Sequence, residues 1–111
     1  MPKEINFFKL NKRLVSLKDV LVSEPYEEGL VVYVTNDEMF ALVTKNKDPI
    51  NLSLRCDKNL GLLLQKKYES VMSGHRLNKN KWITLVLSGQ LSLDDIYDLI
   101  VHSYNLAKEI K

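Results

Sequence analysis

The residues best suited to chemistry in this chain are cations, and one stretch holds the whole basic excess. Residues 58–81 carry six Lys and Arg residues against a single acidic residue, Glu69. The six cations are Lys58, Lys66, Lys67, Arg76, Lys79 and Lys81. The rest of the chain is slightly acidic, so the net charge is only +2. A local basic field attracts phosphate groups, although a solvated lysine-rich surface explains the same charge equally well.

The block from Gly74 to Trp82 combines cations with an amide and an aromatic side chain. This mixture suits a wing that follows DNA phosphates while an Asn or Arg reaches a base edge or the minor groove. The side chains expected at this surface are His75, Arg76, Asn78, Lys79 and Lys81, with Lys66 and Lys67 on the adjoining face. A structural interpretation is also open, in which Gly74 forms a turn, Asn78 bonds the loop backbone and Trp82 anchors the sheet.

Arg55 and Cys56 stand together where a strand pattern gives way to a helix pattern. Alternation in the strand places Arg55 on its polar face, where it joins the basic surface or pairs with Asp57 or an acidic residue of the last helix. A thiol beside Arg55 at a helix start has a lowered pKa if it is exposed. We favour a buried, unreactive Cys56, because no arrangement of His, Asn and Asp surrounds it in the sequence.

Catalytic and metal-binding patterns are not found in the sequence. The spacings between Cys56, His75 and His102 make no zinc signature. The acidic group Asp94, Asp95 and Asp98 is explained by the dipole at the start of a helix. No Gly-rich phosphate loop, nucleophile elbow or pair of catalytic carboxylates occurs. The sequence therefore predicts a protein that is not an enzyme and uses no metal or cofactor.

Composition predicts one domain, residues 1–111, with a core of its own. Apolar residues make up 45% of the 111 residues, and Gly and Pro number only 4 and 3, which is typical of a folded chain. A single cysteine allows no internal disulfide, and no apolar run approaches the length of a membrane span. We therefore expect a cytoplasmic protein that does not insert into a membrane.

Three helices are expected to position these residues. Apolar residues three or four apart predict a helix over 10–22 that ends before Pro25. Asp57 should cap a short second helix, in which Gly61 marks a close packing contact. The apolar face of that helix is expected to hold Leu60, Leu63, Leu64 and Tyr68. Ser92 and Asp95 resemble a capping box that opens a last helix reaching about Glu109.

Strands are predicted from the residue pattern both between the first two helices and after the second one. The runs 30–34 and 39–43 are apolar on both faces, as in central strands, and Asn36 and Asp37 suit the tight turn between them. Further strands are expected over 50–55 and 82–87, with a short irregular one within 71–77. The core should combine Ile50, Leu52, Leu54, Ile83, Leu85, Leu87, Ile96 and Ile100. The expected fold is α+β, with a largely antiparallel sheet packed against N-terminal, middle and C-terminal helices.

Five residue strings, in order along the chain, together resemble the YjbR/MmcQ-like family of small bacterial proteins. They are Pro25-Tyr26 with the run 30–34, then 39–42, 53–57, 74–79 with Trp82, and Ser103-Tyr104. The third string resembles a strand-to-helix junction in which a basic residue, a Cys and an Asp follow one another. In the fourth string, the aromatic, His and Met of the family stand here as His75, Arg76 and Leu77. Positive charge is therefore retained at Arg76, whereas the imidazole moves to the preceding position.

This resemblance implies a CyaY-like fold and a DNA-binding role through a double-wing arrangement of hairpins. Our first hypothesis is accordingly a DNA-binding protein that is not an enzyme. Its contacts are expected from Arg55, Lys66, Lys67, His75, Arg76, Asn78, Lys79 and Lys81. The alternative is a protein-interaction or adaptor domain of the same fold, without a nucleic-acid role, whose basic stretch meets an acidic partner protein.

Overall fold

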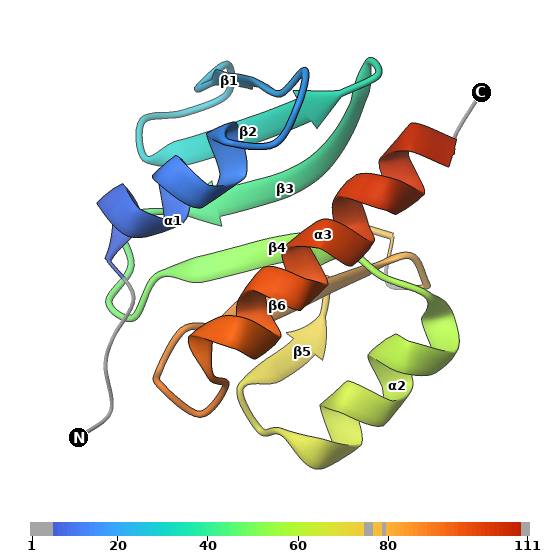
Figure 1. The fold of residues 1–111 in the computed structure, drawn as a ribbon. Coiled ribbons are helices and arrows are strands. Elements are labelled where there is room, and N and C mark those ends of the chain that lie inside the picture. Colours follow the sequence, from blue (N-terminus) through green and yellow to red (C-terminus); the bar gives the residue numbers. More distant parts are fainter. Residues whose placement is uncertain (1–5, 75–76, 79, 110–111) are drawn as a thin grey trace.

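Six antiparallel strands form one sheet, and three helices pack against it (Figure 1). The structure is a computed structural model and describes residues 6–74, 77, 78 and 80–109. The strands are β1 (Leu21–Ser23), β2 (Leu30–Thr35), β3 (Glu38–Thr44), β4 (Asn51–Arg55), β5 (Val71–Ser73) and β6 (Trp82–Val86). The helices are α1 (Phe7–Val15), α2 (Lys58–Lys67) and α3 (Leu93–Glu109). Along the sheet the strand order is β1-β2-β3-β4-β6-β5, which confirms the predicted α+β fold.

The core lies between the sheet and the helices α1 and α3, while α2 packs beside β5 and β6 (Figure 1). Alternate residues of the four central strands are buried and lie side by side in register. They are Val31, Tyr33, Ala41, Val43, Leu52, Leu54, Ile83 and Leu85. The predicted core is confirmed, with Ile50 only partly buried against it. None of the helices in the described residues has the length and apolar content needed to cross a membrane.

Local signals in the sequence are realised at the hairpin and at two helix starts. Asn36 and Asp37 adopt positive φ angles of 54° and 61°, which a two-residue turn between β2 and β3 requires. The Asp57 carboxylate accepts hydrogen bonds from the backbone N–H groups of Asn59 and Leu60, and Ser92 Oγ accepts one from Asp95. These caps fix where α2 and α3 begin.

The prediction of one helix over residues 10–22 is wrong. α1 ends at Val15, and the residues 21–23 form the edge strand β1, which pairs with β2. Between them Asp19 has a φ of 64°, a left-handed conformation that no helix continues through. Pairing with β2, which places Leu21 opposite Val34, satisfies the backbone of this apolar segment. The apolar residues after Val15 therefore keep a helical spacing only by coincidence, and pairing within the sheet decides their conformation. Pro25 therefore ends no helix.

Two further expectations need correction around α2. Leu63 was expected on the buried face, but its side chain is 61% exposed. Gly61 instead lies against the core, where an added Cβ would stand 3.1 Å from Ile83 Cγ2. A helix turns about 100° per residue, so a buried Gly61 directs Leu63 to the opposite side. The irregular strand expected within 71–77 is limited to β5, which ends at Ser73.

Candidate nucleic-acid interface

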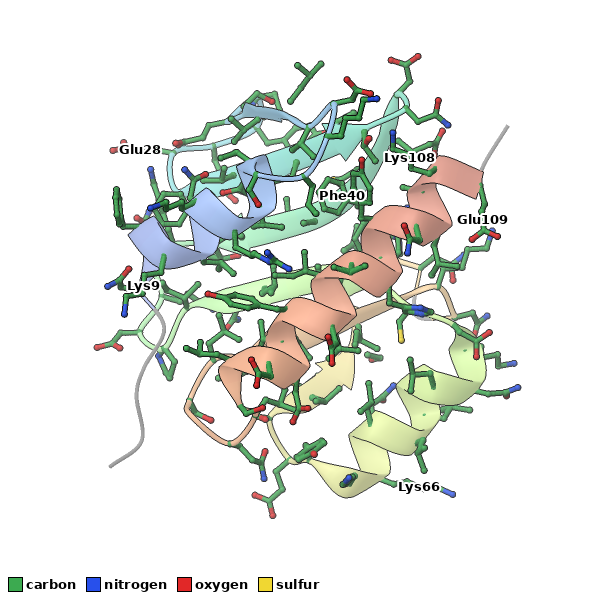
Figure 2. All side chains as sticks on the ribbon, viewed as in Figure 1. Lys9, Glu28, Phe40, Lys66, Lys108 and Glu109 are labelled. Carbon is green, nitrogen blue, oxygen red and sulfur yellow. The ribbon has the colours of Figure 1, made fainter. Side chains whose placement is uncertain are left out.

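The described part of the basic segment lies at one end of the molecule, because α2 and β5 pack beside β6 and away from α1 (Figure 1). We call the surface of α2 and of the loop before β6 the basic end, and its described cations are Lys58, Lys66, Lys67 and Lys81. All four are exposed, and Lys66 projects outward from α2 (Figure 2). His75, Arg76 and Lys79, which the sequence also places in this interface, lie outside the described residues.

The four lysines fall into two groups. Lys58 begins α2, and the carbonyl of Lys81 accepts a hydrogen bond of 2.8 Å from the backbone N–H of Cys56, which ties the loop to this end of the helix. Lys66 and Lys67 end the helix, roughly 12 to 14 Å further along its axis. The ammonium group of Lys67 lies 5.3 Å from the centre of the Tyr68 ring. The four described lysines thus share one end of the molecule without converging on one point.

Asn78 shapes the loop that carries Lys81. Its carbonyl accepts hydrogen bonds from the N–H groups of Lys81 and Trp82, and its side-chain oxygen accepts one from Asn80. Gly74 donates to the carbonyl of Trp82, and an added Cβ on Gly74 would stand 2.6 Å from Trp82 Cβ. The structural role weighed for Asn78 is therefore present, and Trp82 is buried against the same loop. Gly74 forms no turn and instead extends the pairing of β5 with β6.

Arg55 is held by contacts within the sheet. Its Nε donates a hydrogen bond of 2.6 Å to the carbonyl of Met39, and Nη2 lies 3.3 Å from the Glu38 carboxylate. The guanidinium carbon also lies 5.0 Å from the centre of the Trp82 ring. The acidic partner is thus Glu38 of β3, not Asp57 or a residue of the last helix as expected. This ion pair offsets the charge that Arg55 would offer to a phosphate.

Cys56 is buried and free, as the favoured interpretation predicted. Burial, with a smaller contribution from the Asp57 carboxylate, raises the pKa of the thiol to about 11. The thiol is therefore neutral at physiological pH, and Arg55 does not activate it. Nearby, His102 Nε2 accepts a hydrogen bond of 3.2 Å from the N–H of Asp57. Among residues 6–74, 77, 78 and 80–109, no three His, Cys, Asp or Glu side chains are grouped to hold a metal ion.

The sheet face opposite α1 and α3 carries a groove of about 630 Å³ that the sequence analysis did not identify. Its floor includes Ser53 and Thr84, whose hydroxyl oxygens are 2.8 Å apart, while Leu42 and Met72 add apolar surface. Among the described residues that line it, only Glu27 and Lys47 are charged, and their charges cancel. The mixed polar and apolar outward residues of β3 and β4 were the available signal for this face.

A family model and similar proteins of known sequence place this chain in the same family. The family model described as YjbR matches residues 15–106. The uncharacterized protein YjbR of Escherichia coli K12 is 34% identical over 71 residues, which cover 64% of this chain and 60% of that protein. The uncharacterized protein YbdF of Escherichia coli O157:H7 is 29% identical over 96 residues, covering 86% of this chain and 79% of that protein. The match thus spans only about 60% of the length of the YjbR relative.

Two solved structures share the fold. A crystal structure of the Deinococcus radiodurans protein DR2400, described as a DUF419 domain, has a TM-score of 0.91 and 25% identity, with 98% of this chain and 83% of that chain covered. A Pseudomonas syringae protein has a TM-score of 0.80 and 25% identity, with 93% of this chain and 99% of that chain covered.

Proposed function

The chain belongs to the YjbR family, and from the position of its cations we propose that it binds DNA through the basic end without catalysing a reaction. The observation that supports this proposal is that four described cations of the basic segment, Lys58, Lys66, Lys67 and Lys81, lie exposed at one end of the fold with one acidic residue, Glu69, between them in the sequence. Lysine side chains that neutralise phosphates release counterions, which supplies sequence-independent affinity for DNA.

The described lysines of the basic end are available for such contacts. Within the described residues, no salt bridge involves Lys58, Lys66, Lys67 or Lys81. Lys45 and Lys108, by contrast, lie within 4 Å of acidic side chains, at 2.9 Å and 3.8 Å. The groove on the open sheet face is a poorer phosphate site, because the described residues that line it carry no net charge. We therefore assign phosphate contacts to the basic end.

Within this proposal the predicted contact residues have different roles. Lys66, Lys67 and Lys81 supply phosphate contacts, joined by His75, Arg76 and Lys79 on the basis of the sequence. Asn78 contacts a base edge only if its side-chain amide N–H groups face the duplex, since its oxygen already accepts from Asn80. Arg55 stabilises the sheet beneath the loop through Met39, Glu38 and Trp82.

A titration of labelled duplex and single-stranded DNA at several salt concentrations tests the proposal. In one variant Arg76 and Lys79 become Glu, and in a second Lys58 and Lys81 become Glu. A matched control changes Lys9 and Lys18, which are exposed at the α1 side of the molecule, to Glu. Each lost phosphate contact should lower the logarithmic salt slope on duplex DNA by about 0.9, whereas the control should keep the parent slope.

The same titration separates the alternative function. An adaptor domain without a nucleic-acid role should show no DNA affinity better than roughly 100 μM at physiological salt. If both charge-reversed variants stay folded and bind DNA as tightly as the parent, the basic end is not a DNA interface. Asn78→Ala should change preference among DNA sequences only if Asn78 reads a base.

A further inference from the structure

The outward side of α2 has an unusual order of residues. Its exposed positions form two rows of residues four apart, which lie next to each other on a helix. The rows are Lys58, Leu62, Lys66 and Asn59, Leu63, Lys67. Leu62 and Leu63 are 50% and 61% exposed, and they occupy the middle of both rows. We call these six residues the α2 face, a surface with an apolar centre and cationic ends.

The leucines cannot be buried by a small rotation of α2. Gly61 faces the core, with the position of its missing Cβ 3.1 Å from Ile83 Cγ2 and 3.8 Å from Cys56 Sγ. The Asp57 cap holds the start of the helix, and the N–H of Tyr68 bonds the carbonyl of Leu64 at its end. Because both ends and the inner side are fixed, the two leucines remain in solvent unless another molecule covers them.

From this order of residues we propose that the α2 face binds a segment of a partner protein that has apolar side chains at its centre and acidic side chains at its ends. The two leucines would supply the buried centre of such an interface. The lysines at both ends would pair with acidic residues and set the register of the segment. Lys67, whose ammonium group lies over the Tyr68 ring, loses less side-chain freedom in such a pair.

Charge complementarity argues against a second copy of this chain as the occupant. If two α2 faces met around a twofold axis, the cations at each end of one face would stand opposite cations of the other. Like charges at this spacing repel, and the leucines would be brought together only against that repulsion. The carboxylates of Asp57 and Glu69 flank the helix, and the Asp57 carboxylate is already engaged by the backbone N–H groups of Asn59 and Leu60.

The α2 face also differs from a phosphate-binding surface. Leu62 and Leu63 offer no hydrogen bond to a phosphate, so DNA would leave their apolar surface without a matching group. The proposed protein contact therefore uses a feature that the DNA proposal does not use, and it stands whether or not the basic end binds DNA. Substitution of the two leucines can therefore separate the protein contact from the DNA contact in an experiment.

The test measures binding of synthetic helical peptides to the full chain by fluorescence anisotropy, with the site mapped by amide chemical shifts. The main peptide has two central leucines four residues apart, flanked by glutamates. One control peptide replaces the leucines with serines, and another replaces the glutamates with glutamines. The main peptide should bind at least tenfold tighter than either control, and the largest shifts should fall within residues 58–67.

Protein variants complete the test. Changing Leu62 and Leu63 to Ser should weaken binding of the main peptide at least tenfold and leave the DNA salt slope unchanged. The matched control is Leu21→Ser, since Leu21 is 72% exposed on β1 and distant in the sheet order from α2. Circular dichroism of each variant checks that the helices are retained.

Three outcomes would overturn the proposal. The first is equal binding of the main and control peptides. The second is a set of shifts centred on the groove or on β1 in place of α2. The third is binding of the parent to vesicles of phosphatidylcholine and phosphatidylglycerol, lost in the leucine variant, with no binding of the peptide. That last result would identify an anionic lipid surface as the occupant of the α2 face.

Discussion

The Ser103 hydroxyl joins α3 to two strands at the place where their pairing stops. It donates a hydrogen bond of 2.5 Å to the carbonyl of Phe40 and accepts one of 2.8 Å from the N–H of Arg55. Pairing of β3 with β4 continues through Ala41 and Leu54, so Phe40 and Arg55 would be the next partners. One buried side chain therefore satisfies two backbone groups that the ladder leaves without a direct bond.

Replacing Ser103 with Ala should lower the free energy of unfolding by about 1 to 3 kcal/mol, because the partly buried N–H of Arg55 and the buried carbonyl of Phe40 each lose their partner. Chemical denaturation measures this loss. Ser23→Ala, at an exposed position of the edge strand, is the matched control and should change the stability by less than about 0.5 kcal/mol. Equal effects of the two substitutions would show that water replaces the Ser103 hydroxyl.

Cys56 should make stability depend on alkaline pH. Burial, followed by the Asp57 carboxylate, raises its pKa from 9.0 to about 11, so the folded chain keeps the proton after the unfolded chain has lost it. The stabilisation is complete below about pH 9 and is lost as the pH rises to about 11, with an upper limit of about 3 kcal/mol. Denaturation curves from pH 8 to 11 for the parent and for Cys56→Ala measure the difference.

The alanine variant is the control for every other group that titrates in this range, including Tyr33, whose pKa is raised by burial and by the Glu24 carboxylate. A difference between parent and variant that stays constant with pH would contradict the buried neutral thiol. Cys56→Ser should keep the DNA binding of the parent with some loss of stability, since it places a hydroxyl in an apolar site. Loss of binding in a folded Cys56→Ser chain would return the thiol to the candidate site.

Burial of Cys56 could be predicted from the sequence. The prediction rested on the residues next to Cys56, none of which is suited to activate a thiol. The partner of Arg55 could not be predicted in the same way. Glu38 lies 17 residues earlier in the chain, and only the hairpin and the pairing of β3 with β4 bring the two side chains together. Contacts between side chains distant in the sequence require the register, which periodicity alone does not supply.

At the scale of elements, caps and turns were predictable because their signals are local. The Asp57 and Ser92 caps and the Asn36-Asp37 turn each depend on two to four neighbouring residues. The limits of α1 were not predictable by the same means, since Leu21 and Val22 continue its apolar spacing but pair with β2. Leu63 was misplaced for a related reason: the inner side of α2 is set by contact of Gly61 with Ile83, a residue of another element.

The hairpin turn yields a prediction at this scale. Asp37 has a φ of 61°, a conformation that costs an L-residue more than it costs glycine. Asp37→Gly produces the Asn-Gly pair favoured in such turns and should raise the free energy of unfolding by about 0.5 to 1 kcal/mol. Asp37→Val, with a β-branched side chain at the same φ, should lower it by at least about 1 kcal/mol. Thermal denaturation of both variants checks the order, and a glycine variant less stable than the parent would contradict it.

At the scale of the whole molecule, the fold separates three surfaces. One sheet face packs against α1 and α3, and the opposite face carries a groove in which the charges of the described lining residues cancel. The basic end lies at the side formed by α2, β5 and the described residues of the following loop. The sequence predicted the basic end from charge alone. It could not predict the groove, because the outward residues of five strands come together only once the strand order is known.

Because the chain has one core, the effect of a substitution on the free energy of unfolding should depend on whether the residue lies in that core more than on its type. Two leucines, one in the core and one at the sheet edge, test this directly. Leu85 of β6 is 0% exposed and packs in the core, whereas Leu21 of β1 is 72% exposed at the sheet edge. Leu85→Ala should lower the free energy of unfolding by about 2 to 5 kcal/mol, since it removes apolar contacts and leaves a cavity. Leu21→Ala deletes the same atoms from a solvated site and should cost less than about 0.5 kcal/mol in the same denaturation experiment. A small loss for Leu85→Ala would mean that the two faces of β6 are reversed, and with them the assignment of the groove to the open side of the sheet.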